Sequence, residues 1–294
     1  MNIIDIIKLV VLVICSYLMG NISFARLISK FKKDDITKSG SGNPGTMNML
    51  RTYGVKLGAL TLVCDVLKGA IPAFAGLMLF GYGTTAGTIG LYIAGVSVII
   101  GHIYPVFYKF KGGKGIACTL GVFLVADPMW LLIFFAIAFV YLYIFDYGSV
   151  ASLTIVSALT IIQGVKNYGN VIISLLLFVI FTLTWFAHRS NITRLLLGKE
   201  NKANLQKSLK KKFSKQNRQF KTEYLNSKQE IKTEYLKDAD KKDKEKYKEE
   251  KLKYIQEKRH IKDVYIQKRR KVYNYANIVE IVSTQEQSFD KDNE

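Results

Sequence analysis

The chain has 294 residues and a formal net charge of +19, and 49% of its residues are hydrophobic. Charge and hydrophobicity are separated along the sequence, and the three cysteines (Cys15, Cys64 and Cys118) lie within apolar stretches without metal-ligand spacing. This pattern indicates neither a disulfide framework nor a zinc site.

Residues 1–198 contain 15 Lys and Arg against 6 Asp and Glu, a formal charge of +9. Residues 199–294 contain 27 against 17, a formal charge of +10. The first part consists of long apolar runs separated by short polar loops, whereas the second is charged almost throughout. We therefore expect two domains, a membrane-embedded domain over residues 1–198 and a charged tail over residues 199–294.

Apolar stretches long enough to cross a bilayer dominate the first domain. A spanning helix needs about 20 predominantly apolar residues, and these stretches lack the polar face of a soluble amphipathic helix. A shorter stretch, Ile116–Ala126, is consistent with a tilted or half-buried helix. The first run lacks a cleavage site and is expected to be a retained helix rather than a signal peptide. The six longer stretches are Ile6–Phe24, Leu57–Phe80, Ala86–Phe107, Met129–Phe145, Ser149–Val165 and Val171–Ala187.

The positive charges predict the orientation of these spans. Lys and Arg concentrate in the loop over residues 30–56, in the loop over residues 109–114, and after the last span. With seven spans all three basic segments fall on one side of the membrane, which the positive-inside rule makes the cytoplasm. We therefore predict an all-α integral membrane protein with seven transmembrane helices, the N-terminus outside and the C-terminus in the cytoplasm.

The first cytoplasmic loop reads KSGSGNPGTMNMLR over Lys38–Arg51. Its glycines and Pro44 favour a tightly turning backbone that can present several N–H groups to one anion. Serine and asparagine side chains add hydrogen-bonding groups, and Arg51 can fork onto a phosphate or carboxylate. A flexible polar linker without a site is the alternative interpretation.

A second polar segment reads GHIYPVFYKFKGGKGIA over Gly101–Ala117. The glycines let the backbone come close to a ligand, the following helix offers free N–H groups, and Lys111 and Lys114 complete an anion site. The segment lacks the spacing of a Walker A loop. A basic loop that only touches lipid headgroups is the alternative.

A third segment reads HRSNITRLLLGKEN over His188–Asn201, at the cytoplasmic end of the last span. His188, Asn191 and Arg194 recur every third residue, so a continuing helix would place them near one face. The alternative is an interfacial helix end with snorkelling arginines. Within the second span, Asp65 and Lys68 are three residues apart, and we expect them to form an ion pair that holds helices together.

Three motifs in this order resemble the acyl-phosphate-dependent glycerol-3-phosphate acyltransferases of bacteria. The first family motif is matched by Ser41–Arg51, the glycine-rich motif by Gly101–Ala117, and the third by His188–Glu200. The match covers about the first 200 residues. The family usually has Ala-Thr before the second Asn of its first motif, where this chain has Thr46-Met47, which bears on the affinity of that site.

The resemblance implies transfer of a fatty acyl group from acyl phosphate to glycerol 3-phosphate, which yields lysophosphatidic acid and inorganic phosphate. It implies a multi-pass protein of the bacterial plasma membrane, with its active site facing the cytoplasm and the membrane lipid as a partner. It implies no cofactor and no metal, and functional coupling to the soluble enzyme that makes acyl phosphate.

The resemblance also implies roles for individual residues. Ser41, Arg51 and His188 correspond to catalytic residues, and Glu200 to a residue linked to structural integrity, as we also expect of Asp65 and Lys68. The residues expected to bind substrate or phosphate are Asn43, Gly45, Asn48, Lys111, Gly112, Gly113, Lys114, Gly115, Arg189 and Asn191.

The chemistry agrees with these residues, because two phosphorylated anions must be brought together by cations and an alcohol must lose a proton. The base is either His188 or the phosphate of the donor itself. Ser41 has no adjacent triad, so we expect direct transfer without an acyl-enzyme. The His-x₄-Asp motif of other glycerolipid acyltransferases is absent after His102 and after His188.

The tail repeats KTEYL at Lys221 and at Lys232, a spacing of eleven residues that keeps one helical face in register. Leu225, Ile231, Tyr235 and Leu236 form a thin apolar stripe. We expect a long charged helix, partly frayed or disordered, that is dispensable for activity or lies against anionic lipid. Nucleic-acid binding is not expected.

Two other classes of function compete with an enzyme. A transporter of phosphorylated metabolites would favour internal repeats and broken helices that meet at mid-membrane, whereas the polar motifs here lie at one surface. A scaffold organised by the tail would leave the three motifs without a role.

Overall fold

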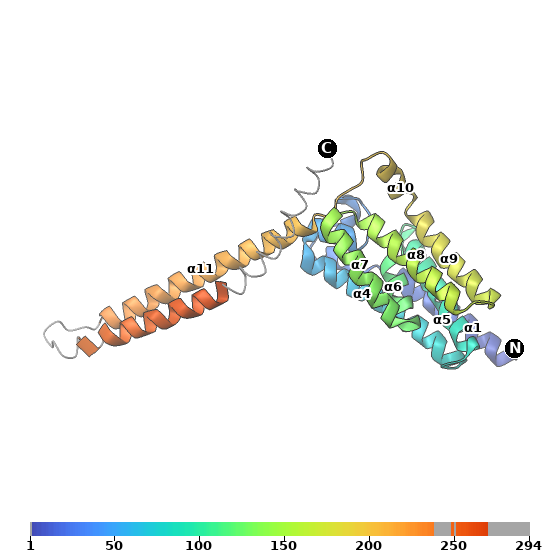
Figure 1. The fold of residues 1–294 in the computed structure, drawn as a ribbon, viewed down its shortest axis with the longest axis horizontal. Helices are drawn as coiled ribbons and strands as arrows, with labels where there is room; N and C mark the ends of the chain where they lie inside the picture. The colour runs from blue at the N-terminus through green and yellow to red at the C-terminus, as the bar shows by residue number, and fades with distance from the viewer. Residues whose placement is uncertain (1, 238–247, 250, 270–294) are drawn as a thin grey trace. The chain divides into compact units, whose positions relative to one another are not determined.

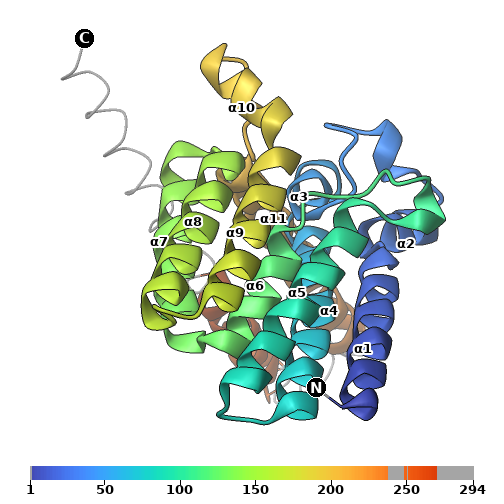
Figure 2. The ribbon, with the colours of Figure 1, turned by 90° about the vertical axis from the view of Figure 1, so that its right-hand side faces the viewer.

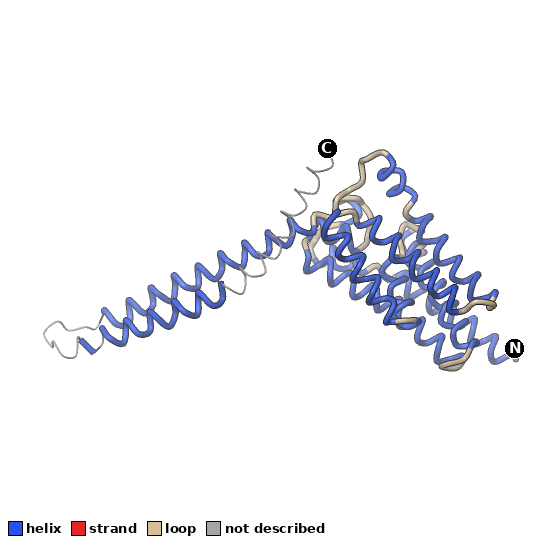
Figure 3. The backbone as a smooth tube through the Cα atoms, viewed as in Figure 1, coloured by secondary structure: helices blue, strands red, loops and turns tan. Residues whose placement is uncertain are grey.

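The computed structural model describes residues 2–237, 248–249 and 251–269, and over these residues its regular structure is helical, without a strand (Figures 1 and 3). The chain divides into two compact units, residues 1–205 and residues 206–294. In the first unit, long helices pack side by side as a bundle (Figure 2).

The helices of the first unit follow the predicted apolar stretches with small differences at their ends. Each long helix is joined to the next by a short loop, except around α2, α3 and α6, where polar segments intervene. The helices are α1 (Ile3–Asn21), α2 (Phe24–Phe31), α3 (Thr46–Tyr53), α4 (Val55–Phe80), α5 (Thr85–Ile103), α6 (Ile116–Ala126), α7 (Pro128–Phe145), α8 (Gly148–Lys166), α9 (Val171–Ala187) and α10 (Arg189–Leu196), with 3₁₀ turns η1 (Ile36–Lys38) and η2 (Val106–Tyr108).

Helix starts follow local capping signals in the sequence. The side chain of Thr84 accepts a hydrogen bond from the Gly87 N–H at the start of α5, and that of Asn170 accepts from Ile173 at the start of α9. At α7, Asp127 caps the Trp130 N–H at 3.3 Å and proline occupies the first turn. These caps satisfy N–H groups that the first turn of a helix leaves unpaired.

The centre of the bundle is formed by α4, α5 and α6. Helix α5 is the most enclosed of the long helices. In its most apolar stretch of 18 residues 67% of the residues are buried, whereas in that of α7 only 6% are buried. Apolar side chains such as Val63, Leu132 and Phe178 remain exposed on the outer surface. A bundle with an apolar exterior is the arrangement expected of helices surrounded by lipid.

Small residues allow α4 and α6 to touch through their backbones. A Cβ atom added at Gly69 would lie 2.2 Å from the carbonyl oxygen of Cys118, and one added at Gly121 would lie 2.0 Å from that of Val66. Membrane helices depend on such close approach, because no hydrophobic force drives them together in lipid.

The number of helices that are long enough to cross a membrane is lower than the seven that the sequence predicts. Among the described residues five helices meet the length and hydropathy required, or six if α9 and α10, which are bent by 55° at His188, count as one span. The difference lies in α6, whose 11 residues extend about 16 Å, roughly half of the hydrocarbon core.

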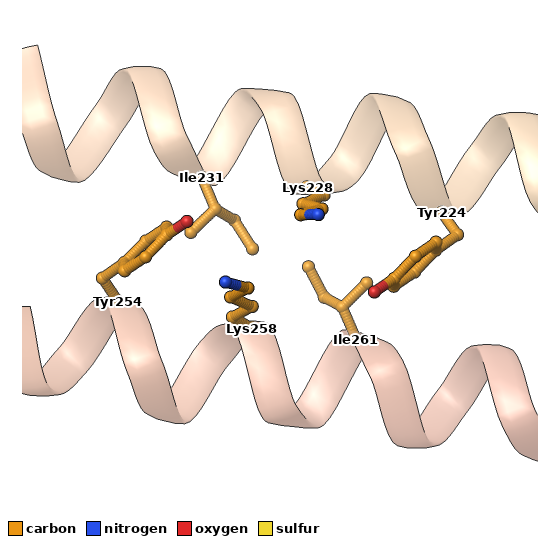
Figure 4. Close-up of a pocket in the computed structure, with 6 residues that line it drawn as sticks. All are labelled: Tyr224, Lys228, Ile231, Tyr254, Lys258 and Ile261. Atoms are coloured by element: carbon orange, nitrogen blue, oxygen red, sulfur yellow. The ribbon is translucent and has the colours of Figure 1, made fainter.

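The second unit contains α11 (Leu205–Lys237), whose first residue belongs to the first unit, and a helix over residues 251–269. The two helices run antiparallel, and the rings of Tyr224 and Tyr265 stack with their centroids 4.7 Å apart. Tyrosine, isoleucine and lysine side chains from both helices line their seam (Figure 4). The tail is thus a helical hairpin over its described residues, rather than one long helix.

The apolar stripe expected in the tail is only partly described. Ile231 is buried in the seam of the hairpin, whereas Leu225 is exposed. The side chains of Tyr235 and Leu236 lie outside the described residues.

We predict that Gly69→Ala destabilises the first unit by about 1–3 kcal/mol, because the added methyl group collides with the backbone of α6. The matched control is Gly164→Ala in α8, where an added Cβ meets no atom within 4 Å, and whose stability should match or exceed that of the wild type. Thermal unfolding of the detergent-solubilised protein measures both. Equal midpoints for the two variants would contradict the tight α4–α6 contact.

Candidate functional site

A cavity of about 270 Å³ opens at the end of the bundle where the three polar motifs meet. Its walls come from the first loop with α3, from α4, from the start of α6, from α7 and the first half of α8, and from the segment that follows α9. Residues of all three motifs line it, among them Ser41, Asn43, Gly45, Asn48, Arg51, Lys114, Gly115, His188, Asn191 and Glu200.

Asn48 fixes the backbone of the first motif. Its side-chain oxygen accepts the Ser41 N–H at 2.9 Å, and its amide nitrogen donates to the carbonyl groups of Ile36 and Ser39 at 3.1 and 2.9 Å. Gly40 has a φ of +58°, and a Cβ there would lie 2.3 Å from the Asn48 oxygen. Asn48 therefore shapes the loop that presents Ser41, and the glycine makes room for it.

Thr46 and Met47 stand where the chain departs from the family motif. Thr46 is the first residue of α3, and its hydroxyl oxygen is buried without a hydrogen-bond partner. Met47 packs against Gly148 at the start of α8, because a Cβ added to that glycine would lie 2.5 Å from the methionine Cε. Both side chains line the cavity.

The glycine-rich loop packs closely onto the end of α5. The N–H groups of Gly112 and Gly113 donate to the carbonyl groups of Ile103 and His102, each at 3.1 Å. Cβ atoms at these glycines would lie 2.0 Å from the His102 carbonyl oxygen and 2.2 Å from its Nε2 atom. These two glycines therefore permit close packing, and their N–H groups are already satisfied. They do not line the cavity, unlike Lys114 and Gly115.

His188 occupies the break between α9 and α10 and is buried. Its Nδ1 lies 2.8 Å from the carbonyl oxygen of Thr184. A carbonyl group only accepts hydrogen bonds, so the proton of the neutral imidazole belongs on Nδ1. Nε2 then carries a free lone pair, as a general base requires.

Glu200 connects three elements at the base of the cavity. Its carboxylate accepts hydrogen bonds from Ser149 at the start of α8 and from Asn191 and Arg194 on α10, at 3.1, 2.6 and 3.0 Å. The side-chain oxygen of Asn191 in turn accepts a hydrogen bond from the Lys114 ammonium group. This chain of contacts joins the second motif to the third.

The cations at the cavity influence one another. Burial and the neighbouring charge of Arg194 lower the pKa of Lys114 to about 8. Burial also lowers the pKa of Arg51, which the carboxylates of Glu200 and Asp146 partly offset. Three partly desolvated cations, Arg51, Lys114 and Arg194, outnumber the two carboxylates that offset them, so the cluster retains positive potential and attracts anions.

The deeper wall of the cavity combines a buried ion pair with apolar side chains. Asp65 and Lys68 pair at 3.0 Å, and Nδ1 of His102 lies 4.0 Å from the same Asp65 oxygen. Lys68 also donates to the carbonyl groups of Gly20 and Ile22, which fixes the end of α1. Apolar side chains line the same wall, among them Leu62, Leu120, Phe135, Phe139, Leu142 and Ile155.

Two of the predicted binding cations lie outside the cavity lining. The Arg189 guanidinium stacks on the Phe186 ring at 4.5 Å and donates to the Phe186 carbonyl group. Lys111 is exposed, and its backbone carbonyl accepts a hydrogen bond from Arg26 at 2.8 Å. In the described part of the chain, no group of three or more His, Cys, Asp or Glu side chains is arranged to hold a metal ion.

Sequence reasoning did not identify Ser149 or Leu205 as parts of the cavity. A single serine at a helix start and a leucine beyond the third motif carry no local signal. Their placement depends on contacts between segments far apart in the sequence.

The fold and the site together define a helical integral membrane protein with a cationic cavity at one end of its bundle. The sequence model of the glycerol-3-phosphate acyltransferase family matches residues 10–198. The chain therefore belongs to the glycerol-3-phosphate acyltransferase family.

Individual relatives agree with this assignment. The chain is 38% identical over 195 residues to the glycerol-3-phosphate acyltransferase of Finegoldia magna, which covers 66% of this chain and 96% of the relative. It is also similar to crystal structures of PlsY (YgiH), an integral membrane glycerol 3-phosphate acyltransferase. The glycerol 3-phosphate form is 38% identical, with a TM-score of 0.61, and the lysophosphatidic acid form is 37% identical, with a TM-score of 0.60. Each match covers 66% of this chain and 95% of that structure.

We predict that Glu200→Ala lowers the free energy of unfolding by about 2–4 kcal/mol, because it leaves buried donors and the Arg194 charge without their partner. Asp5→Asn is the control, since Asp5 forms an exposed pair with Lys8 at 4.0 Å, and its loss should cost less than about 1 kcal/mol. Thermal unfolding in detergent compares the two. If Glu200→Ala is as stable as the control, Glu200 does not hold these three elements together.

Proposed function

We propose that this protein transfers a fatty acyl group from acyl phosphate to glycerol 3-phosphate and releases lysophosphatidic acid and inorganic phosphate. The observation that carries the proposal is a single cavity that combines Ser41, Arg51, Lys114 and His188 with an apolar wall. The two similar PlsY structures are a glycerol 3-phosphate form and a lysophosphatidic acid form, which match the acceptor and a product of this reaction.

We propose seven crossings of the bacterial plasma membrane, with the N-terminus outside and the cavity facing the cytoplasm. Lys114, just before α6, contacts Asn191 at one end of the bundle. Asp127, just after α6, accepts a hydrogen bond from Gln163 near the opposite end of α8 at 3.0 Å. These contacts support a passage of the short α6 from one end of the bundle to the other, and the basic loops support a cytoplasmic cavity.

The apolar wall suits the acyl chain of a lipid-soluble donor. Leucine and phenylalanine side chains of α4, α6 and α7 line the cavity beside the cations. An acyl phosphate has the same two parts, a long alkyl chain and an anionic head. The membrane lipid then serves as the solvent from which the donor enters, while the acceptor arrives from water.

The cations bring the two phosphorylated substrates together. Arg51 and Lys114 both line the cavity, and the positive charge of Arg51 contributes to the lowered pKa of Lys114. Two anions repel in water, so positive side chains in a partly enclosed site lower the free energy of their encounter. Arg189 stays a predicted contributor, with a guanidinium that contacts Phe186 instead.

In the transfer step, the primary hydroxyl oxygen of the acceptor attacks the acyl carbonyl carbon and forms the new ester bond. The bond from that carbon to the phosphate oxygen breaks, and inorganic phosphate leaves with the electron pair. The hydroxyl proton passes to Nε2 of His188, whose Nδ1 proton is held by the Thr184 carbonyl, or to the leaving phosphate. A base in this position contributes about 10²–10⁴-fold to the rate.

Ser41 has a binding role in this scheme. Its backbone is held by Asn48, and among the described residues no hydrogen bond from its hydroxyl to a histidine is found. The hydroxyl, together with Asn43 and the loop N–H groups, binds the donor phosphate or the developing oxyanion. Trapping of a covalent acyl group on Ser41 during turnover would refute this role.

We further propose that residues 1–198 form the acyltransferase domain and residues 199–294 a cytoplasmic tail. The protein depends functionally on the soluble enzyme that supplies acyl phosphate and needs no cofactor of its own. The family match over residues 10–198 supports the extent of the catalytic domain.

We predict that Arg51→Ala and His188→Ala each lower kcat/KM about 10²-fold or more, and that Ser41→Ala lowers it about 10-fold or more, because each removes a group that stabilises charge in the transition state. Release of phosphate from acyl phosphate in the presence of glycerol 3-phosphate measures the rate. Arg218→Ala, at an exposed position in α11, serves as the arginine control and should match the wild type. Full activity of the three site variants would refute the proposed site.

We predict that kcat/KM for glycerol 3-phosphate falls as pH rises through about 8, because the Lys114 ammonium group is present below its pKa of about 8 and is lost above it. Lys114→Arg should retain activity at pH 9 relative to its own value at pH 7, since arginine stays protonated. If this variant loses activity over the same pH range as the wild type, the titrating group is not Lys114.

A further inference from the structure

A five-residue segment after the third motif packs against the cavity, although the family match ends at residue 198. This segment, here called the strap, consists of residues 201–205 and leads from α10 to the first residue of α11. Ala203 is fully buried and Leu205 is 5% exposed, and Leu205 lines the cavity. The strap therefore belongs to the first unit as an ordered part of the wall.

The strap holds the guanidinium group of Arg51 through two backbone carbonyl groups. Arg51 donates from Nε to the Lys202 carbonyl at 2.8 Å and from Nη2 to the Asn201 carbonyl at 3.0 Å. A guanidinium has five donors in one plane, so these bonds occupy one edge and fix the orientation of the whole group. The remaining donors, including those on Nη1, are left for a ligand in the cavity that Arg51 lines.

Asp146, in the turn between α7 and α8, anchors the strap. Its backbone carbonyl accepts the Ala203 N–H at 2.8 Å, and its carboxylate accepts the N–H groups of Asn204 and Leu205 at 2.9 and 3.2 Å. Asp146 has a φ of +62° and Asn204 a φ of +59°, a conformation that aspartate and asparagine tolerate better than most side chains. Three consecutive N–H groups are thereby tied to one residue.

We propose that Asp146 and the strap position Arg51 for binding the phosphorylated substrates, so that the working site extends beyond the family-matched residues. Asp146 is a positioning residue, since it acts through the strap and does not itself touch a substrate. This inference rests on the proposed function only in the identity of the anion that Arg51 binds.

If the strap instead inhibited the site, its release would change the anion affinity in the opposite direction. If the Asn201 and Lys202 carbonyl groups competed with substrate for Arg51, release of the strap would tighten anion binding. If they orient Arg51, release allows the side chain to sample other rotamers and weakens binding. The two accounts are therefore distinguished by the direction of the change.

The test uses the full-length protein and a matched pair of substitutions at one position. Asn204→Pro removes one of the three N–H groups that Asp146 accepts, and proline cannot adopt a positive φ, so the substitution releases the strap. Asn204→Gly keeps the N–H and favours the same φ, so it preserves the strap. Asp146→Ala removes the carboxylate, and Asp146→Asn keeps one acceptor oxygen and should lie between Asp146→Ala and the wild type.

Calorimetry measures the Kd of glycerol 3-phosphate and of inorganic phosphate, and transfer kinetics are followed separately. We expect about tenfold weaker binding of at least one of these anions for Asp146→Ala and Asn204→Pro, no change for Asn204→Gly, and kcat within about threefold of the wild type. In an Arg51→Lys background, Asp146→Ala should have no further effect on Kd, because a lysine lacks the edge that the strap holds.

Unchanged or tighter anion binding in Asp146→Ala would overturn the proposal, as would additive effects of Asp146→Ala and Arg51→Lys. A wild-type protein that binds glycerol 3-phosphate but does not consume acyl phosphate would instead refute the proposed donor, while the Kd series still tests the strap. If Asn204→Pro has a lower thermal midpoint and Asp146→Ala does not, the proline variant is misfolded. The anion affinity of Asp146→Ala then decides the outcome.

Discussion

The chain of contacts from Lys114 through Asn191 to Glu200 is the interaction on which the site depends. The cavity holds cations from three separate segments, which would repel one another in a partly dehydrated space. Glu200 and Asp146 partly offset this repulsion, and Glu200 also ties α8 and α10 together. Arg51 and Lys114 line the cavity and Arg194 pairs with Glu200 beside them, while the lining carboxylate of Asp65 is paired with Lys68. The three cations outnumber the carboxylates of Glu200 and Asp146 that offset them, which suits the phosphorylated substrates proposed above.

Close steric packing shapes the irregular backbone at this end of the bundle. The helices α4, α5 and α6 approach one another closely through glycines such as Gly69, Gly76 and Gly121. The loop that packs onto the end of α5 needs residues without side chains, because Gly112 and Gly113 lie directly against His102. The break at His188 turns the chain by 55°, which directs α10 and Glu200 back toward the cavity. The regular packing of the helices thus positions the irregular segments that surround the cavity.

Much of the bundle could be predicted from the sequence, because membrane helices are read from length and hydropathy alone. The stretch Val171–Ala187 coincides with α9, and α4 and α7 begin within two residues of the predicted starts. The short α6 reduces the number of helices of spanning length to five or six, and seven crossings stay a prediction. The meeting of three polar motifs at one cavity also followed from their charge and order.

Other features depend on contacts that no local pattern encodes. The sequence predicts that the glycines of the second motif let the backbone approach a ligand, whereas Gly112 and Gly113 pack onto the end of α5 and their N–H groups bond to its carbonyl groups. Arg189 and Asn191 lie two residues apart and are both predicted to bind substrate. Of the two, only Asn191 lines the cavity, on the helix that follows the bend at His188. The strap and the pairing of the tail helices arise from long-range contacts of Asp146 and Tyr224 with distant segments.

The most direct test of the central claim is a double-mutant cycle between Lys114 and Asn191, measured as kcat/KM for glycerol 3-phosphate. If the second and third motifs act as one site, Lys114→Ala and Asn191→Ala will be non-additive by about 1 kcal/mol or more, because each removes the partner of the other. Additive effects within about 0.5 kcal/mol would show that the two motifs act independently and would contradict the account.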